Sequence, residues 1–123
     1  MYKYLFCTLA LLFSSMAIAN NCNNPRDDFD GLYCLNKVYQ QADKDLNTAY
    51  KKLKRLLKKR DRKTLRNRQR SWIEDRNDSC SFYRDGMFFV SLRCTTDITI
   101  DRTNQLTNRI RECKATGCQP RKL

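Results

Sequence analysis

Apolar residues recur at every third or fourth position from Leu32 onward, the spacing that places side chains on one face of an α-helix. This pattern predicts a long amphipathic helix that continues to about Arg60 and measures roughly 40 Å at about 1.5 Å per residue. The polar segment before it, residues 20–30, contains Pro25 and is expected to be a loop. The apolar stripe comprises Leu32, Leu35, Val38, Ala42, Leu46, Ala49, Leu53, Leu56 and Leu57, with Tyr39 and Tyr50 beside it.

A second, more polar stripe predicts another helix, from about Arg62 to Tyr83. The apolar pattern lapses just before it, and Asp is a residue type that caps helix N-termini, so we expect Asp61 to be the N-cap. Trp72 is expected to be the core anchor between the helices. The residues near one face of this helix are Leu65, Gln69, Trp72, Ile73, Arg76, Cys80 and Tyr83.

A third helix is predicted from Leu92 to about Cys113, and Gly117 and Pro120 end it in a short tail. Its stripe comprises Cys94, Ile98, Arg102, Leu106 and Ile110.

Gly86 breaks the pattern between the second and third helices. Residues 85–92, DGMFFVSL, are expected to form a short apolar connection that packs over the open end of the bundle. The pattern as a whole predicts an all-α fold. We expect a small antiparallel three-helix bundle with a long helical hairpin, stapled by disulfides, in a single domain that spans residues 20–123.

The N-terminal residues 1–19 are typical of a signal peptide. Lys3 precedes an apolar run from Tyr4 to Phe13, and Ala17-Ile18-Ala19 matches the small-residue pattern of a cleavage site. The run is shorter than the roughly 20 residues that span a bilayer, which argues against a membrane anchor. We expect cleavage after Ala19 and a soluble mature chain that is periplasmic or secreted.

Removal of Cys7 with the signal peptide leaves six cysteines. An even number in a small exported chain is typical of a disulfide framework, and about fifteen connectivities are open to six cysteines. Metal binding is the competing interpretation, but the chain has no His and no C-x2-C pair, so we expect no metal and no cofactor. Antiparallel helices bring the end of the second helix near the start of the third, which favours the pair Cys80–Cys94. Cys22 would then clamp the entry loop to the first helix at Cys34, and Cys113 with Cys118 would close the tail.

Positive charge is concentrated in residues 51–70, KKLKRLLKKRDRKTLRNRQR, which hold twelve Lys or Arg and one acid, Asp61. Outside this block and the signal peptide, basic and acidic residues are equal in number, so we expect a neutral body with one cationic hairpin tip. Like charges repel and destabilise the helices that carry them, which favours an anionic partner over a merely soluble surface. The residues expected to bind it are Lys51, Lys52, Lys54, Arg55, Lys58, Lys59, Arg62, Lys63, Arg66 and Arg68.

Several anionic partners fit this charge. Nucleic acid is the usual partner of such a patch, but an oxidising, extracytoplasmic compartment normally holds little of it. Anionic lipid would attract a polybasic segment by about 1 kcal/mol per charge. An acidic protein or an anionic wall polymer would fit as well.

Three ordered motifs resemble the LprI-like family of exported bacterial proteins, which is named after a lysozyme inhibitor. The segment ADKDLNTAY gives A-D-x-x-L-N-x-x-Y from Ala42 to Tyr50. LRNRQRSWIEDRNDSC gives L-x3-Q-R-x-W-x3-R-x3-C from Leu65 to Cys80, and CTTDITIDRTNQL gives C-x4-T-x2-R-x3-L from Cys94. The chain departs from the family at Asn77, where Asp is usual, in the pair Cys113 and Cys118, and in its more cationic tip.

The polar residues of these motifs fall on or beside helix faces that should meet. We therefore expect an internal polar network, in which Asp43 pairs with Arg76 or Arg102, because buried charge is tolerated when it is paired and hydrogen-bonded. A recognition surface is the alternative. The network residues are Asp43, Asn47, Gln69, Arg76, Thr99 and Arg102.

The resemblance implies a non-enzymatic binding protein that acts on a cell-wall hydrolase or another envelope protein. The alternative is a periplasmic adaptor for an envelope machine, such as a secretion or wall-remodelling complex, recruited through the polybasic tip. We expect no catalytic residues. Glu74, Asp75 and Asp78 lie among arginines without a His, and a glycosidase needs two carboxylates in a concave site.

The charge of the tip limits the choice of hydrolase. Animal lysozymes of the common type are cationic, so a tip of net charge +11 would repel them. We therefore expect an acidic or neutral hydrolase, or contact through the opposite end near Cys34 and Cys80. At that end the loop RDGMFFVSL could enter a substrate cleft.

Overall fold

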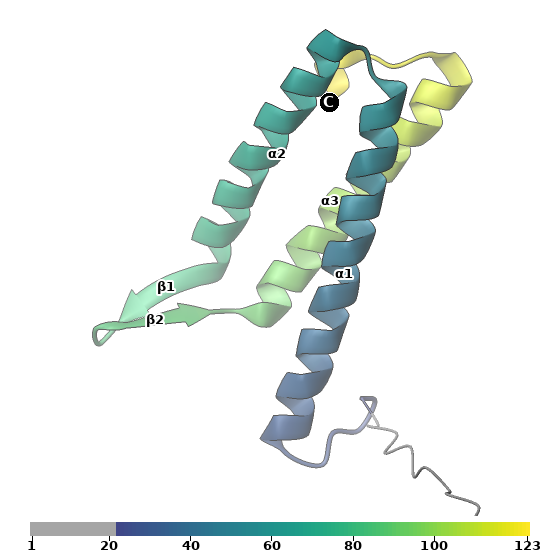
Figure 1. The fold of residues 1–123 in the computed structure, drawn as a ribbon. Coiled ribbons are helices and arrows are strands. Elements are labelled where there is room, and N and C mark those ends of the chain that lie inside the picture. Colours follow the sequence, from purple (N-terminus) through teal and green to yellow (C-terminus); the bar gives the residue numbers. More distant parts are fainter. Residues whose placement is uncertain (1–21) are drawn as a thin grey trace, which may run out of the picture.

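The computed structural model describes residues 22–123, so the expected signal peptide and its cleavage site lie outside the described residues. The elements are α1 (Asp28–Leu56), α2 (Lys59–Cys80), β1 (Ser81–Arg84), β2 (Met87–Val90), α3 (Leu92–Thr116) and a 3-10 turn, η1 (Pro120–Lys122). Each helix runs antiparallel to the one before it in the chain, and the hairpin β1–β2 extends from the end opposite the α1–α2 turn (Figure 1). The mostly helical fold predicted from the sequence is confirmed.

Helix α1 begins four residues before the predicted start at Leu32 because polar residues form a complete N-terminal cap. The carboxylate of Asp27 accepts a hydrogen bond from the Asp30 backbone N–H at 2.8 Å, as N-cap residues do. Arg26 forms an ion pair with Asp30, with 2.6 Å between Nε and Oδ2. The helix has 29 residues, which corresponds to about 44 Å.

The turn between α1 and α2 is tighter than predicted. Leu57 and Lys58 are both extended, and α2 begins at Lys59 with Lys58 as its N-cap. The prediction that Asp61 caps α2 is therefore wrong, since Asp61 lies inside the first turn and is buried. The Arg62 Nε donates to the Leu57 carbonyl at 2.8 Å and ties α2 to the turn.

A β-hairpin replaces the apolar connection expected between α2 and α3. The strands pair antiparallel, with Phe82 opposite Phe89 and Tyr83 opposite Phe88. Asp85 and Gly86 have φ values of 52° and 74°, as the two central residues of a type I′ turn require. The hairpin does not close the bundle, because its side chains remain largely exposed. It ends α2 at Cys80, before the predicted end at Tyr83.

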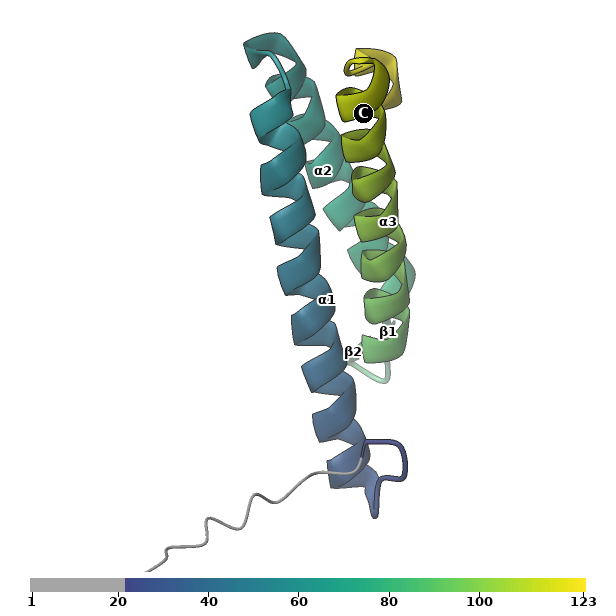
Figure 2. The same cartoon turned by 90° about the vertical axis from the view of Figure 1, so that its right-hand side faces the viewer.

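The core lies in the half of the molecule that contains the α1–α2 turn. Helix α1 packs mainly against α3, and α3 also contacts α2 (Figure 2). Trp72 is half-buried and packs against the edge of the core, so it is a peripheral contact more than a central anchor. The buried core cluster comprises Leu46, Ala49, Leu53, Leu57, Leu65, Leu106, Ile110 and Leu123.

The other half of the molecule has few buried apolar residues. The stripe residues Leu32 and Val38 are 58% and 50% exposed, although their spacing predicted that they would pack in the bundle. Here α3 presents buried threonines, Thr95, Thr96 and Thr99. Their hydroxyls donate to backbone carbonyls four residues earlier, at 2.7 to 2.8 Å, which satisfies these buried polar groups.

Three disulfides reinforce this arrangement, and they are the three pairs predicted from the sequence. Cys22–Cys34 ties the N-terminal segment to α1, and Cys80–Cys94 joins the end of α2 to the start of α3. Cys113–Cys118 closes the turn after α3. Disulfides form in oxidising compartments, so the three pairs indicate an extracytoplasmic protein. Within residues 22–123, no helix is long and apolar enough to span a membrane.

Candidate partner-binding surfaces

Charge divides the molecule into two halves. The half with the α1–α2 turn, residues 51–70 and 102–123, carries eighteen basic residues and two acids. The half with the hairpin, residues 22–50 and 71–101, carries six basic residues and eleven acids. Outside residues 51–70 the basic and acidic residues still balance, as predicted, but they are unevenly placed, because the fold brings the basic C-terminal part of α3 beside the basic turn (Figures 1 and 2). The protein is a strong electric dipole.

The cationic tip, residues 51–70, surrounds a cavity of about 660 Å³. Five of the ten predicted anion-binding residues line this cavity, together with Arg60, which the prediction left out. The lining residues are Lys54, Lys59, Arg60, Arg62, Lys63 and Arg66.

The other five predicted residues lie outside this cavity. Lys51 and Arg55 are exposed on α1, and Lys58 is exposed in the turn. Lys52 lines a shallow hollow between α1 and α3, and Arg68 lines one between α2 and α3. Their role in binding an anion stays a prediction.

Almost all of the positive charge at the tip is unneutralised. Among the described residues, the one ion pair within the tip joins the Arg60 Nε to the Asp61 Oδ1 at 3.5 Å. Asp61 is 6% exposed, so its carboxylate does little to offset the outer cations. The tip therefore offers a dense set of cations that are free to meet an external anion.

Aromatic and apolar residues crowd the opposite end. The Phe82 and Phe89 rings stack at 5.3 Å between centroids, and the Tyr83 and Phe88 rings pair at 4.9 Å. The Arg84 guanidinium lies over the first pair, 5.1 Å from the Phe89 ring centroid. Tyr83 is 77% exposed. Such a surface is typical of an interface that contacts another protein, since aromatic residues and Arg are enriched there.

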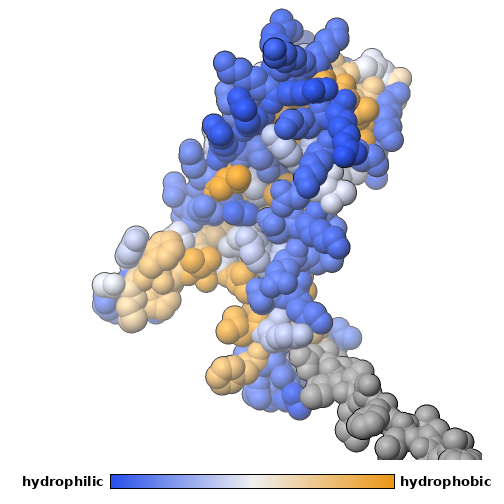
Figure 3. Space-filling model, in the orientation of Figure 1, coloured by the Kyte–Doolittle hydropathy of each residue, from blue (hydrophilic) through white to orange (hydrophobic). Residues whose placement is uncertain are grey.

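The N-terminal part of α1 adds a second apolar surface beside the hairpin. Phe29, Leu32, Tyr33 and Val38 are all exposed on it. Figure 3 shows the two apolar areas at the same end of the molecule, while the tip is hydrophilic. Exposed apolar groups that gather in this way mark sites of contact with a partner. We call the hairpin and these α1 residues the aromatic end.

A cleft of about 290 Å³ lies at the aromatic end, between the helices and the hairpin. Its wall combines apolar side chains with one guanidinium, that of Arg76. The lining residues are Tyr39, Arg76, Asn77, Cys80, Ser81, Phe88, Val90, Leu92 and Thr95. A partner side chain could enter this cleft while the hairpin contacts the partner from outside.

The six residues of the predicted polar network form three separate pairs. Asn47 donates to the carboxylate of Asp43 at 3.0 Å within α1. The Arg76 Nη1 donates to the Thr99 hydroxyl at 3.4 Å, and the Arg102 Nε donates to the Gln69 Oε1 at 3.1 Å.

Within residues 22–123, Asp43 forms no ion pair with Arg76 or Arg102, so that expected pairing is wrong. Arg76 lies on α2, with which α1 has little contact, and the Arg102 guanidinium is directed to Gln69 of α2, to which its Nε donates.

Arg76 and Arg102 occupy different surroundings. The Arg76 guanidinium lies 5.1 Å from the Trp72 ring centroid and donates twice to the Asn77 side chain. Burial lowers the pKa of Arg102, and the nearby Arg68 charge lowers it further. The buried Nη2 of Arg102 has no hydrogen-bond partner among the described residues. Burial of the Arg102 guanidinium is thus unfavourable, and its role is structural. Arg76, in contrast, lines the cleft.

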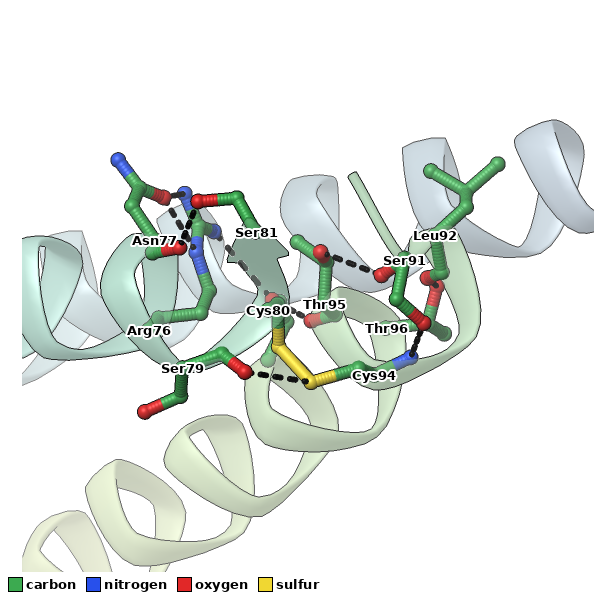
Figure 4. Close-up of a disulfide and its surroundings, with 11 residues drawn as sticks. Arg76, Asn77, Ser79, Cys80, Ser81, Ser91, Leu92, Cys94, Thr95 and Thr96 are labelled. Carbon is green, nitrogen blue, oxygen red and sulfur yellow. Dashed lines mark hydrogen bonds between the residues drawn. A yellow bond between two sulfur atoms is a disulfide. The ribbon is translucent and has the colours of Figure 1, made fainter. Parts of the chain in front are cut away.

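The disulfide Cys80–Cys94 fixes the hairpin to the helices (Figure 4). The Ser91 backbone N–H donates to the Cys80 carbonyl at 2.8 Å, so both ends of the hairpin are held where the chain leaves α2 and enters α3. The Ser91 hydroxyl accepts from the Cys94 N–H and caps α3. These contacts position the hairpin before any partner binds, which lowers the entropic cost of association.

The sequence contained a signal for the hairpin that the helical interpretation passed over. Asp-Gly flanked by residues of high β-propensity is a strong indicator of a two-residue hairpin turn. Asp85-Gly86 lies between SFYR and MFFV and fits this pattern. The part that Tyr39 plays in the cleft had no such signal, since it depends on how α1 packs against the other elements.

Comparison with known proteins supports the resemblance seen in the motifs. A family model described as lysozyme inhibitor LprI matches residues 20–106. No curated protein and no solved structure matches the chain. The matched region includes both the cationic tip and the aromatic end.

Proposed function

Because the chain belongs to the LprI lysozyme inhibitor family, we propose that its mature form, from Asn20 onward, is a periplasmic or secreted binding protein that inhibits a lysozyme-type wall hydrolase. It acts by binding and has no catalytic activity of its own. The observation that carries this proposal is the aromatic end, where an exposed hairpin stands beside an apolar cleft.

The hairpin has the shape and chemistry to block a substrate cleft. It projects from the helices, carries two aromatic pairs and is held in place by Cys80–Cys94. A lysozyme-type enzyme binds a sugar polymer in a concave site that contains two carboxylates. Aromatic rings can occupy the positions of sugar rings, and Arg84 at the turn can approach a carboxylate as a bidentate donor.

The distribution of charge favours a basic hydrolase at this end. The hairpin half has eleven acids against six basic residues, so it attracts a cationic enzyme, whereas the tip repels it. The dipole would therefore orient the encounter and bring the aromatic end to the enzyme. The sequence predicted an acidic or neutral hydrolase, because the tip repels a basic one, or else contact through the end near Cys34 and Cys80. Binding of a basic enzyme at the aromatic end corresponds to the second of these.

A lysis assay with purified enzymes tests the proposal. The mature protein is added to a cationic animal lysozyme and, separately, to an acidic wall hydrolase, and the clearing of a cell-wall suspension is followed. We expect inhibition of the cationic enzyme. The double variant Tyr83→Ser, Phe88→Ser should weaken inhibition by roughly thirtyfold, as the loss of an interface hot spot does.

Leu56→Ser provides a matched control, because Leu56 is also an exposed apolar residue but lies at the tip. It should inhibit as the native protein does. If the mature protein inhibits neither enzyme, the proposal is rejected. If the hairpin variant and Leu56→Ser lose the same amount of inhibition, the hairpin is not the inhibitory element.

A second candidate function rests on the unpaired cations of the tip. An adaptor for an envelope machine, recruited through residues 51–70, would retain its partner when the hairpin is changed and lose it when the tip cations are replaced. Inhibition of a purified hydrolase by the mature protein alone would favour the first function over this one.

A further inference from the structure

The cationic half of the molecule is not used by the proposed inhibition, and it has features of a binding site in its own right. We propose that this half docks on an anionic phospholipid bilayer, with lipid phosphates entering the cavity at the tip. The proposal does not depend on the identity of the hydrolase.

Charge is the first argument. Residues 51–70 and 102–123 carry eighteen basic residues against two acids, and both acids are engaged. Asp61 is buried beside Arg60, and Glu112 pairs with Arg109 at 2.7 Å. Polybasic surfaces gain affinity for acidic bilayers with each added cation. Few acidic side chains therefore compete with an external anion for the basic residues of this half.

The residue types of this half argue against a protein or a nucleic acid as the partner. Residues 51–70 and 102–123 contain no Phe, Tyr, Trp or Met, although the whole chain has sixteen such residues. Ten of the eighteen cations are Arg, a type that protein interfaces also favour, but this half lacks the aromatic and Met residues of such interfaces and carries eight Lys, which they disfavour. Single-stranded nucleic acid is held by aromatic stacking as well as by charge. A bilayer surface needs cations and little else.

The shape of the tip suits lipid head groups. The open pocket of about 660 Å³ is walled largely by the aliphatic stems of cationic side chains from the end of α1 and the first two turns of α2, and their charged ends are available to phosphates of more than one lipid. Leu56 is 41% exposed among these cations and provides an apolar side chain for the head-group region. The other tip leucines, Leu53, Leu57 and Leu65, are buried in the core.

Docking in this way would leave the aromatic end free. The hairpin and the tip lie at opposite ends of the molecule (Figure 1). A protein bound to the bilayer through its tip therefore presents the hairpin away from the lipid. Binding to lipid and binding to a hydrolase can then occur together.

Co-sedimentation with vesicles tests the proposal. The mature protein is mixed with vesicles of phosphatidylcholine alone or of phosphatidylcholine with phosphatidylglycerol. We expect binding only to the second kind, and loss of binding at about 1 M salt, where the Debye length falls to about 3 Å. Added glycerol phosphate at constant ionic strength should not compete, because a single soluble phosphate lacks the other charges of the bilayer.

Two triple variants distinguish binding at the tip from an effect of net charge, because each removes three positive charges but at different ends of the molecule. Lys54, Lys59 and Lys63 are changed to Gln in the first, and Lys37, Lys44 and Arg93, which are exposed in the hairpin half, are changed to Gln in the second. The tip variant should bind roughly a hundredfold more weakly, since each cation near an acidic bilayer contributes about fivefold. The second variant should bind within about threefold of the native protein.

Equal weakening of vesicle binding in both variants would overturn the proposal, because it would show that binding depends only on the net charge of the protein. Absence of binding to anionic vesicles, or full competition by glycerol phosphate, would overturn it as well. The tip variant changes no residue of the aromatic end, so the lysis assay should give native inhibition with that variant. A failure of the lipid proposal is therefore distinguishable from a failure of the inhibitor proposal.

Discussion

Arg102 of α3 donates from Nε to the Oε1 of Gln69 on α2 across 3.1 Å, and this bond links two residues that are 33 positions apart. Arg102 is half-buried and its Nη2 has no partner among the described residues, so the Gln69 carbonyl is an important acceptor for a guanidinium that burial disfavours. The α2–α3 contact therefore depends on a polar bond as well as on leucine packing.

Replacing Gln69 by Met should remove this acceptor while nearly preserving side-chain shape. A charged donor left without its partner costs about 1–3 kcal/mol. Because Arg102 is only half-buried, we expect the free energy of unfolding to fall by an amount near the lower end of this range. Urea denaturation measures the change in the free energy of unfolding. Asn67→Met, at an exposed position of the same helix, is the control. A loss no larger than that of the control would show that the bond contributes nothing.

Replacing Gly86 by Val should destabilise the hairpin, because Gly86 has a φ of 74° and a branched side chain is strained there by about 1–2 kcal/mol. Amide hydrogen exchange should speed up in β1 and β2 while the core of α1 is unchanged. Asp85→Asn is the control, since Asn tolerates a positive φ. Faster exchange throughout α1 would contradict a local effect.

Removing the disulfide Cys80–Cys94 by changing both cysteines to Ser should lower stability by about 3 kcal/mol, the value for a closed loop of about this length. The loop spans 14 positions. The matched pair Cys113→Ser, Cys118→Ser opens a loop of 5 positions, and the same relation gives about 2 kcal/mol. Thermal unfolding measures the loss of stability in each variant. A larger loss for the Cys113–Cys118 variant than for the Cys80–Cys94 variant would contradict the loop-length argument.

Leu53 and Leu56 lie three positions apart on α1 but differ in burial, at 0% and 41% exposed. Leu53→Ala should cost about 2–5 kcal/mol, because it removes contacts and leaves a cavity in the core. Leu56→Ala should change stability by less than about 1 kcal/mol. Chemical denaturation of the two variants compares them directly, and similar losses would mean that the tip leucines share one environment.

The Arg26–Asp30 ion pair should make the start of α1 sensitive to acid. The hydrogen bond from Arg26 lowers the pKa of Asp30. A carboxyl whose pKa is lowered by folding contributes stability above its ordinary pKa, and that contribution is lost as pH falls through the lowered value. Arg26→Gln should raise the pKa of Asp30, which NMR titration of the carboxyl carbon can follow. An unchanged pKa would show that the Arg26 side chain does not lower it.

Much of the helical architecture followed from the spacing of apolar residues, because that spacing decides which side of a helix can be buried. Leu46, Ala49, Leu53 and Leu57 all lie in the core, and the three predicted disulfide pairs are present, of which Cys80–Cys94 follows from antiparallel geometry.

The pattern failed where an apolar residue has no partner. Leu32 and Val38 continue the stripe of α1 beyond the core, and both are exposed. Spacing identifies a face, but it cannot show whether another element covers that face.

The candidate sites were less predictable for the same reason. The cationic tip could be recognised because its charges are adjacent in the sequence. The acidity of the hairpin half could not, because its eleven acids are dispersed over two segments that only the fold brings together. The cleft likewise combines Tyr39 with Phe88, residues that are far apart along the chain.

The uneven placement of the core has a consequence for how the protein responds to thiols. Leucine packing holds the tip half in addition to Cys113–Cys118, whereas the hairpin half relies on Cys22–Cys34 and Cys80–Cys94 together with threonine contacts. A reductant breaks all three bonds, but only the tip half keeps a leucine core without them, so the aromatic end should loosen first. A reduced protein would then still adhere to an anionic surface after it has lost the geometry needed to inhibit.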